Sequence, residues 1–173
     1  TSEVIEAVDK WAAALDKNEP TYEHNMLEAL WVHQYHNVVS EPLLRRMLKS
    51  PDSRARAADA RILCTRSNHV NDSLDLFRTL VQDESPRVRL EAVRAASFYR
   101  TYVAADLALE ALKRPMDYYL DYTLTETLRQ LEPYWRQAIA RGLPIAADNP
   151  KGIDRLIGRL NSSEIEKLPR TEG

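Results

Sequence analysis

Apolar residues recur every three or four positions along much of the chain, which is the spacing that forms one face of an α-helix. Such a face in the stretch 86–100 comprises Val88, Ala92, Ala95, Ala96 and Tyr99. A half-buried strand would instead alternate apolar and polar residues, and the sparse Val and Ile residues rarely do so. The pattern therefore predicts a succession of helices.

The pattern repeats after 33 residues. The stretch 43–67 aligns with the stretch 76–100 over 25 residues without a gap. Residues of like character coincide, namely Leu44 with Phe77, Leu48 with Val81, Arg56 with Arg89 and Cys64 with Ser97. A backward shift of 33 places Trp11 at the position of Leu44, and a forward shift of 31 places Tyr119 at that of Val88. Self-similarity at this period is typical of stacked helical repeats.

Each repeat is predicted to be a hairpin of two helices joined by a tight turn. Four repeats are expected, at about 3–37, 41–67, 71–101 and 103–132, followed by capping or continuing helices within 134–168. Ser85 and Pro86 indicate a helix start, because Ser can cap free amides and Pro tolerates the first helical position. Because one hairpin cannot bury its apolar faces alone, we expect an all-α fold, a right-handed α-α superhelix of about four to five hairpins. It would form one domain over residues 1–173.

The composition supports a folded helical chain and narrows the choice of partner. Hydrophobic residues make up 44% and charged residues 29%, which excludes a disordered chain. The net charge of −2 gives no reason to expect nucleic acid or an anionic membrane surface. The longest apolar runs fall short of the roughly 18 residues of a membrane span, so no membrane insertion is expected. A lone cysteine, Cys64, excludes an internal disulfide and is expected to be a buried spacer.

Part of the third repeat resembles the HEAT-repeat consensus through Asp83, Pro86, Val88, Arg89 and Ala92. Ala55 and Arg56 are the weaker counterpart one repeat earlier. The resemblance implies a HEAT-like solenoid with a ladder between repeats, in which an Arg reaches an acidic turn residue. It assigns the ladder arginines to Arg56 and Arg89, with Asp52 and Asp83 as candidate acceptors.

Longer segments resemble the HEAT region of large bacterial proteins that are often labelled membrane-bound dehydrogenase-like and carry a c-type haem domain. These segments are ALWVHQYHNVVSEPLLRRML, SPRVRLEAVRAASFYRT, ALKRPMDYYLDYTL and LEPYWRQAIARGLPIAADNP. The resemblance implies export to the periplasm and a scaffold role within a redox protein. The chain has no Cys-x-x-Cys-His motif, so any dehydrogenase activity would lie in other domains. Its start at Thr1 without Met and its end at Gly173 also indicate a piece of a larger protein.

His33 and His36 lie three residues apart on one predicted helix and are candidates for contacting a metal or a haem. A stable metal site needs three or four ligands, and no third ligand stands at a matching spacing. The simpler interpretation is that both side chains cap the helix end and bond to the following turn. No cofactor is predicted.

Two pairs of arginines suggest a basic stripe that binds a protein partner. Arg54 and Arg61 are seven residues apart, as are Arg87 and Arg94, so each pair lies on one helix face. Repeat symmetry would place the two pairs side by side. The alternative is a salt-bridged surface, because acidic residues lie nearby in sequence, namely Asp59, Asp83, Glu84 and Glu91.

The C-terminal part of the chain carries an aromatic cluster of Tyr118, Tyr119, Tyr122, Tyr134 and Trp135. Tyr and Trp combine a large contact area with a polar atom, which is typical of interfaces, although a plain core explains them equally well. Tyr118 and Tyr122 share one helix face and are the candidates for binding a partner. Tyr119 falls at the buried position of Val88.

The sequence contains no motif typical of a catalytic site. It has no Gly-rich phosphate loop, no Gly-x-Ser-x-Gly elbow and no His-Glu-x-x-His motif. The leading hypothesis is therefore a non-catalytic scaffold for protein–protein or interdomain contacts, made through a concave face lined by the second helices. The alternatives are a metal- or haem-contacting module that uses His33 and His36, and a nucleic-acid-binding solenoid.

Overall fold

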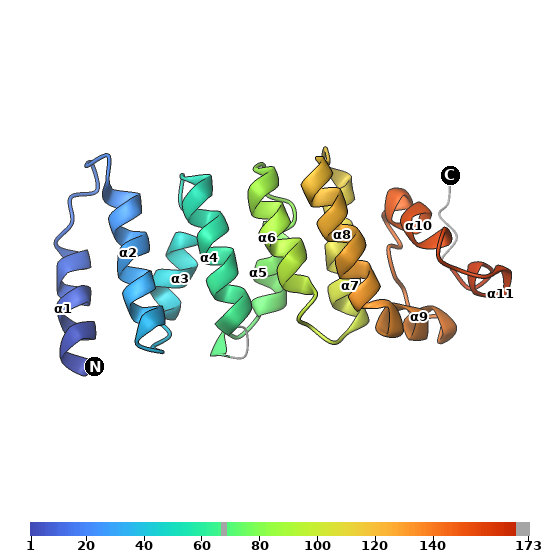
Figure 1. Ribbon diagram of the computed structural model, residues 1–173, viewed down its shortest axis with the longest axis horizontal. Helices are drawn as coiled ribbons and strands as arrows, with labels where there is room; N and C mark the ends of the chain where they lie inside the picture. Colours follow the sequence, from blue (N-terminus) through green and yellow to red (C-terminus); the bar gives the residue numbers. More distant parts are fainter. Residues whose placement is uncertain (67–68, 169–173) are drawn as a thin grey trace. The chain divides into compact units, whose positions relative to one another are not determined.

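The computed structural model describes residues 1–66 and 69–168, and within these ranges all regular structure is helical (Figure 1). The predicted all-α fold class is therefore confirmed. Residue 67, with which the predicted second repeat ends, lies outside the described residues. The helices come in pairs at the positions that the repeat pattern predicts.

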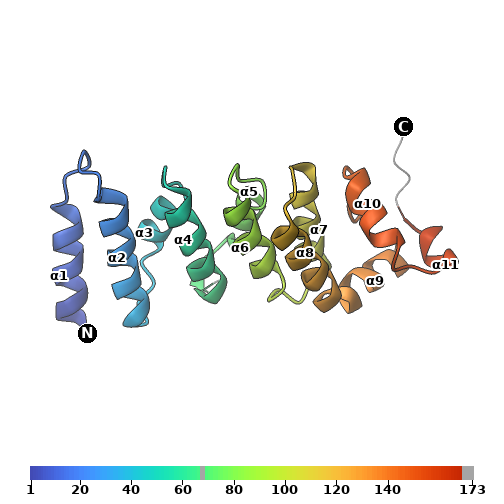
Figure 2. The ribbon, with the colours of Figure 1, turned by 45° about the horizontal axis from the view of Figure 1, so that its top comes forward.

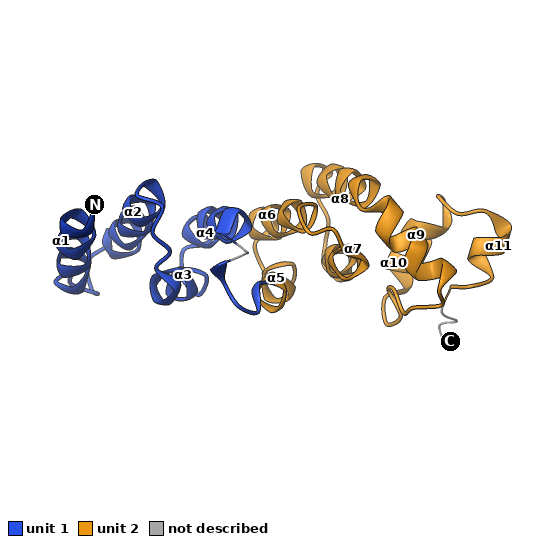
Figure 3. Ribbon diagram, turned by 90° about the horizontal axis from the view of Figure 1, so that it is seen from below, with its two compact units in different colours: residues 1–73 blue, residues 74–173 orange. Residues whose placement is uncertain are grey.

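The chain forms two compact units, residues 1–73 and 74–173 (Figure 3). Each unit is described by itself below. That the whole chain is one domain stays a prediction.

The first unit contains two helical hairpins. Its helices are α1 (Ser2–Ala13), α2 (Tyr22–Tyr35), α3 (Glu41–Met47) and α4 (Ser53–Arg66), with α2 packed between α1 and the second hairpin (Figures 1 and 2). Leu30, Leu44 and Leu63 are fully buried in its core. Helix α1 contributes no buried residue. Trp11 is 44% exposed although the repeat pattern places it at the position of Leu44, which is 1% exposed.

The second unit contains two further hairpins and a C-terminal group of short helices. The hairpins are α5 (Ser73–Leu80) with α6 (Pro86–Ala96), and α7 (Tyr102–Leu109) with α8 (Tyr118–Gln130), and a 3-10 turn, η2 (Glu110–Lys113), extends α7. The C-terminal helices are α9 (Glu132–Ala140), α10 (Pro150–Ile157) and α11 (Ser162–Ile165). Trp135 belongs to the core of this unit, because its ring is fully buried and its Nε1 donates to the carbonyl of Leu128 at 2.8 Å.

Two helix starts in this unit are fixed by aspartate side chains. Helix α6 begins at Pro86 as predicted, but the Ser85 hydroxyl makes no capping bond. The Ser85 amide instead donates to the Asp83 carboxylate at 2.8 Å. At α8 the Asp117 carboxylate accepts from the amide of Leu120 at 2.8 Å, which satisfies one of the free amides of the first turn.

The connection that leads into α10 is held by Asn149. Its buried side chain donates to the carbonyl of Leu109 at 2.8 Å and accepts from the amide of Gly152 at 3.0 Å. A Cβ at Gly152 would lie only 2.9 Å from the Cβ of Ala146, so this position requires glycine. The C-terminal helices are thereby fastened to the end of α7.

Candidate protein-binding surface

Three tyrosines at the start of α8 are the most exposed group of aromatic side chains in the second unit. Tyr118, Tyr119 and Tyr122 are 76%, 71% and 59% exposed. The rings of Tyr118 and Tyr119 meet edge to face with their centroids 5.5 Å apart. Exposure of Tyr118 and Tyr122 agrees with the sequence prediction, whereas the prediction that Tyr119 is buried is wrong.

The error at Tyr119 is one of register. The buried residues of α8 fall 32 residues after their counterparts in α6, so that Leu120 corresponds to Val88, Leu124 to Ala92 and Leu128 to Ala96. The shift of 31 moved the alignment by one residue, which rotates a helical position by about 100°. Comparing Ser85 with Asp117, which precede the two helices, gives the correct shift from sequence alone.

The correct register places Tyr119 at the position equivalent to Arg87. Helices α6 and α8 lie side by side (Figure 1), and the hydroxyl of Thr127 donates to the carbonyl of Val93 at 3.1 Å. Equivalent residues on the two helices therefore point to the same side of the unit. The exposed side chains at and next to this position, Arg87 and Arg94 of α6 and Tyr118, Tyr119 and Tyr122 of α8, are together called the α6–α8 face below.

The charges on the α6–α8 face are only partly neutralised. Arg94 lies 3.6 Å from the carboxylate of Glu91, which is itself almost fully buried. Arg87 is exposed and has no ion pair within the described part of the chain. The face therefore presents at least one unpaired cation beside three aromatic rings.

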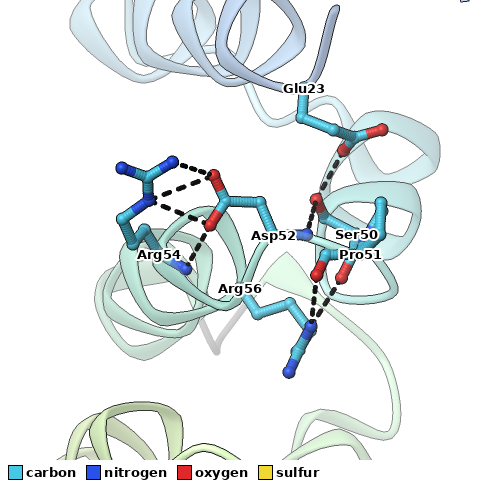
Figure 4. A network of polar contacts seen from close by, with 6 residues as sticks. All are labelled: Glu23, Ser50, Pro51, Asp52, Arg54 and Arg56. Atoms are coloured by element: carbon cyan, nitrogen blue, oxygen red, sulfur yellow. Dashed lines mark hydrogen bonds and ion pairs between the residues drawn. The ribbon is translucent and has the colours of Figure 1, made fainter. Parts of the chain in front are cut away.

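In the first unit, Arg54 and Arg61 lie on exposed positions of α4. Arg54 is paired with Asp52, whose carboxylate it meets at 2.9 Å (Figure 4). Its hydrogen bonds lower the pKa of Asp52. Asp59, which was expected to neutralise arginines on the surface, is fully buried and cannot do so. A stripe that joins these two arginines to the pair on α6 stays a prediction.

The predicted ladder arginines are buried but bind carbonyl oxygens. Arg56 Nη1 donates to the carbonyls of Ser50 at 2.8 Å and Pro51 at 3.3 Å (Figure 4). The Asp52 carboxylate, which is the candidate acceptor for Arg56, accepts hydrogen bonds from Arg54. Arg56 thereby holds the backbone of the turn that precedes α4.

Arg89 joins the turns of the two successive hairpins of the second unit. It donates to the carbonyls of Asp83 at 2.8 Å and Glu84 at 2.9 Å, and also to that of Pro115 at 2.5 Å, just before α8. Its bond to Asp83 is thus made to the backbone oxygen. Burial, together with the nearby charge of Arg114, lowers the pKa of Arg89.

A second network ties α2 to the following hairpin within the first unit. The Glu23 carboxylate accepts from Arg46 at 2.5 Å. It also accepts from the hydroxyl of Ser50 at 2.5 Å (Figure 4). Burial raises the pKa of Glu23, but these hydrogen bonds outweigh burial and leave the pKa lowered. The sequence analysis missed this network, because Glu23 is more than 20 residues from both of its partners and the spacing follows no repeat.

The two candidate histidines do not present a pair of ligands. His33 is buried and its Nε2 lies 2.9 Å from the carboxylate of Asp9 in α1, rather than bonding to the following turn as expected. The half-buried ring of His36 packs edge to face on Tyr35. Among the described residues no group of three His, Cys, Asp or Glu side chains is placed to hold a metal ion.

The burial of the lone cysteine and the length of the apolar helices were also predicted from the sequence. Cys64 is half-buried rather than buried. Within residues 1–66 and 69–168, no helix is both long enough and apolar enough to cross a membrane.

The fold and the α6–α8 face define a helical repeat protein with a surface suited to protein contacts. Residues 40–129, just over half of the chain, match HEAT repeats. The chain belongs to the HEAT-repeat family, which is generally non-catalytic and generally serves as a scaffold for protein interactions. Neither the curated proteins nor the solved structures include one with significant similarity to this chain.

Proposed function

We propose that this chain is a non-catalytic scaffold that binds a protein partner through the α6–α8 face. The observation that carries the proposal is the exposure of three neighbouring tyrosines at the start of α8, together with Arg87 on the adjacent helix α6, which has no ion pair among the described residues. Tyr and Arg are enriched among the few residues that supply most of the binding free energy of an interface. A tyrosine that is already held on a helix also loses little conformational entropy on binding.

The partner is proposed to be a neighbouring domain of a larger parent chain or a separate protein. A photo-reactive amino acid at position 122, placed in the protein in its host, would cross-link the partner for identification by mass spectrometry. Tyr35 is the matched control position, because it is an exposed tyrosine on α2 in the other unit. We expect a specific product from position 122 and none from position 35. The same products from both positions would contradict the proposal.

Affinity for the captured partner then tests the residues of the face. Tyr122→Ala, and separately the pair Arg87→Glu and Arg94→Glu, should each raise Kd at least tenfold, because each removes or inverts a contact group at the centre of the face. The pair Lys151→Glu and Lys167→Glu inverts two exposed cations elsewhere in the same unit and serves as the charge-matched control. Unchanged circular dichroism ensures that folding is intact. An equal rise in Kd for both pairs would contradict binding through the α6–α8 face.

The setting proposed for the scaffold rests on the quoted segments that resemble dehydrogenase-like bacterial proteins. The proposed parent protein is an exported bacterial protein with a c-type haem domain, and its oxidation chemistry would take place outside residues 1–173. The complete reading frame tests this setting. A signal sequence before residue 1 and a Cys-x-x-Cys-His motif elsewhere would support it, and a frame that lacks both would contradict it.

A further inference from the structure

A groove with arginines on its rim lies between the start of α7 and the end of α9. It has a volume of about 190 Å³, and its lining includes Arg100, Tyr102, Tyr134, Gln137, Arg141 and Leu143. None of them belongs to the α6–α8 face. The groove is therefore a separate feature of the second unit.

The groove is lined by hydrogen-bond donors of positive charge. Arg100 and Arg141 are exposed, and neither forms an ion pair with any described residue. The hydroxyls of Tyr102 and Tyr134 and the amide of Gln137 add neutral donors, and the lining includes no carboxylate. A site with two unpaired guanidinium groups and no acidic neighbour favours an oxyanion, because each guanidinium offers a fork of N–H donors that matches a carboxylate.

The backbone fixes where Arg141 and Leu143 stand. Helix α9 ends in a turn in which Gly142 has φ +68°, a conformation that favours glycine, and the amide of Leu143 donates to the carbonyl of Ala138 at 2.9 Å. The amide of Arg141 donates to the carbonyls of Gln137 and Ala138, both at 3.1 Å. The rim of the groove is thus a hydrogen-bonded helix end rather than a free loop.

A neighbouring groove differs from this one because its lining contains acidic residues. It has a volume of about 290 Å³ and shares Tyr102, but it combines basic residues with Asp106, Glu110 and Asp148. Its charges are engaged internally, since Lys113 lies 2.7 Å from Glu110 and Asp106 accepts from the amide of Ala146 at 2.6 Å. Of these two grooves, only the one with Arg100 and Arg141 has unpaired cations.

The volume of the groove indicates what size of anionic group it can bind. Sites for cofactors and drug-sized molecules are typically about 300–1,000 Å³, so a groove of 190 Å³ suits one side chain rather than a whole cofactor. Exposed Leu143 stands on the rim beside the cations and provides an apolar contact that a free inorganic ion would not use.

We propose that this groove binds an acidic side chain of a protein segment, with an apolar neighbour of that side chain packed on Leu143. The carboxylate would bridge Arg100 and Arg141, and the tyrosine hydroxyls would donate to it. The site does not depend on the α6–α8 face, so either proposal can fail without the other.

The test is a titration of the 15N-labelled chain with three probes, followed by NMR. The probes are acetyl-Ala-Glu-Glu-Leu-Ala-amide, its counterpart with Gln in place of Glu, and inorganic phosphate. We expect saturable shifts of the backbone amides of Arg100, Gly142 and Leu143 with the acidic peptide and not with its Gln counterpart. Equal shifts with both peptides, or none with either, would overturn the proposal. Phosphate that binds as tightly as the acidic peptide would make the groove a free-anion site and would also overturn it.

The residues are tested with two variants of equal charge. The pair Arg100→Gln and Arg141→Gln should weaken the acidic peptide at least tenfold, because both guanidinium groups of the groove are removed. The pair Arg114→Gln and Lys151→Gln removes the same charge outside the groove and should leave Kd within twofold. Equal weakening by both pairs would show attraction by overall charge and would refute the assignment to the groove.

Discussion

Asp59 carries a fully buried carboxyl group in α4 that has no hydrogen-bond partner in the described structure. Burial alone raises its pKa to about 8. Because a charged carboxylate is costly to bury, the folded chain favours the protonated acid, whereas the unfolded chain releases the proton near pH 4. The contribution of Asp59 to stability is therefore largest below about pH 4 and is lost as the pH rises towards 8, by at most about 6 kcal/mol.

This argument predicts the pH dependence of an Asp59→Asn variant. Between pH 5 and pH 8 the Tm of the wild-type chain should fall, while the Tm of the variant should fall clearly less, because Asn does not ionise. Asp52→Asn is the control, since Asp52 has a lowered pKa and does not titrate in this window. Thermal unfolding followed by circular dichroism at four pH values gives the slopes. Parallel slopes for wild type and Asp59→Asn would refute the assignment.

At the scale of the elements, the helices and their pairing were predictable from sequence, and the interactions between them were not. Helical periodicity and the 33-residue repeat locate α2, α4, α6 and α8, because burial imposes the same spacing on each hairpin. Predicting the α6–α8 face requires the correct alignment of α8 on α6. One residue more or less in the connection between the helices changes that alignment. The Arg100–Arg141 groove could not be foreseen, because its arginines are distant in sequence and only the packing of α7 and α9 joins them.

Arg89 shows how much one buried side chain contributes to joining elements. Arg89→Lys should lower the free energy of unfolding by about 2 kcal/mol, because a lysine cannot reach three carbonyls at once and leaves buried acceptors unsatisfied. Arg87→Lys, on the exposed side of the same helix, should change it by less than about 0.5 kcal/mol. Urea unfolding of the three proteins measures both differences. An equal effect of the two substitutions would mean that the carbonyl contacts of Arg89 add no stability.

At the scale of the whole molecule, charge and stability both differ from one part of the chain to another. The net charge of −2 conceals a groove with two unpaired arginines, so the average charge of the chain does not describe what its parts attract. Stability in repeat proteins is likewise close to a sum of the terms of single repeats and of neighbouring pairs. The two compact units should therefore differ in stability according to the core that each one buries.

The second unit buries the larger part of the core and includes Trp135, the largest fully buried side chain. A fragment of residues 74–173 should therefore fold alone and unfold cooperatively in urea. The chain has three tryptophans and the other two are Trp11 and Trp31, so the fluorescence of this fragment reports on Trp135 alone. We expect blue-shifted emission that moves to the red in a single transition, coincident with the loss of the circular dichroism signal. The fragment 1–73, in which α1 buries no residue, should unfold at lower urea concentration. Red-shifted emission from the fragment 74–173 in buffer would show that the core around Trp135 does not form in that unit by itself.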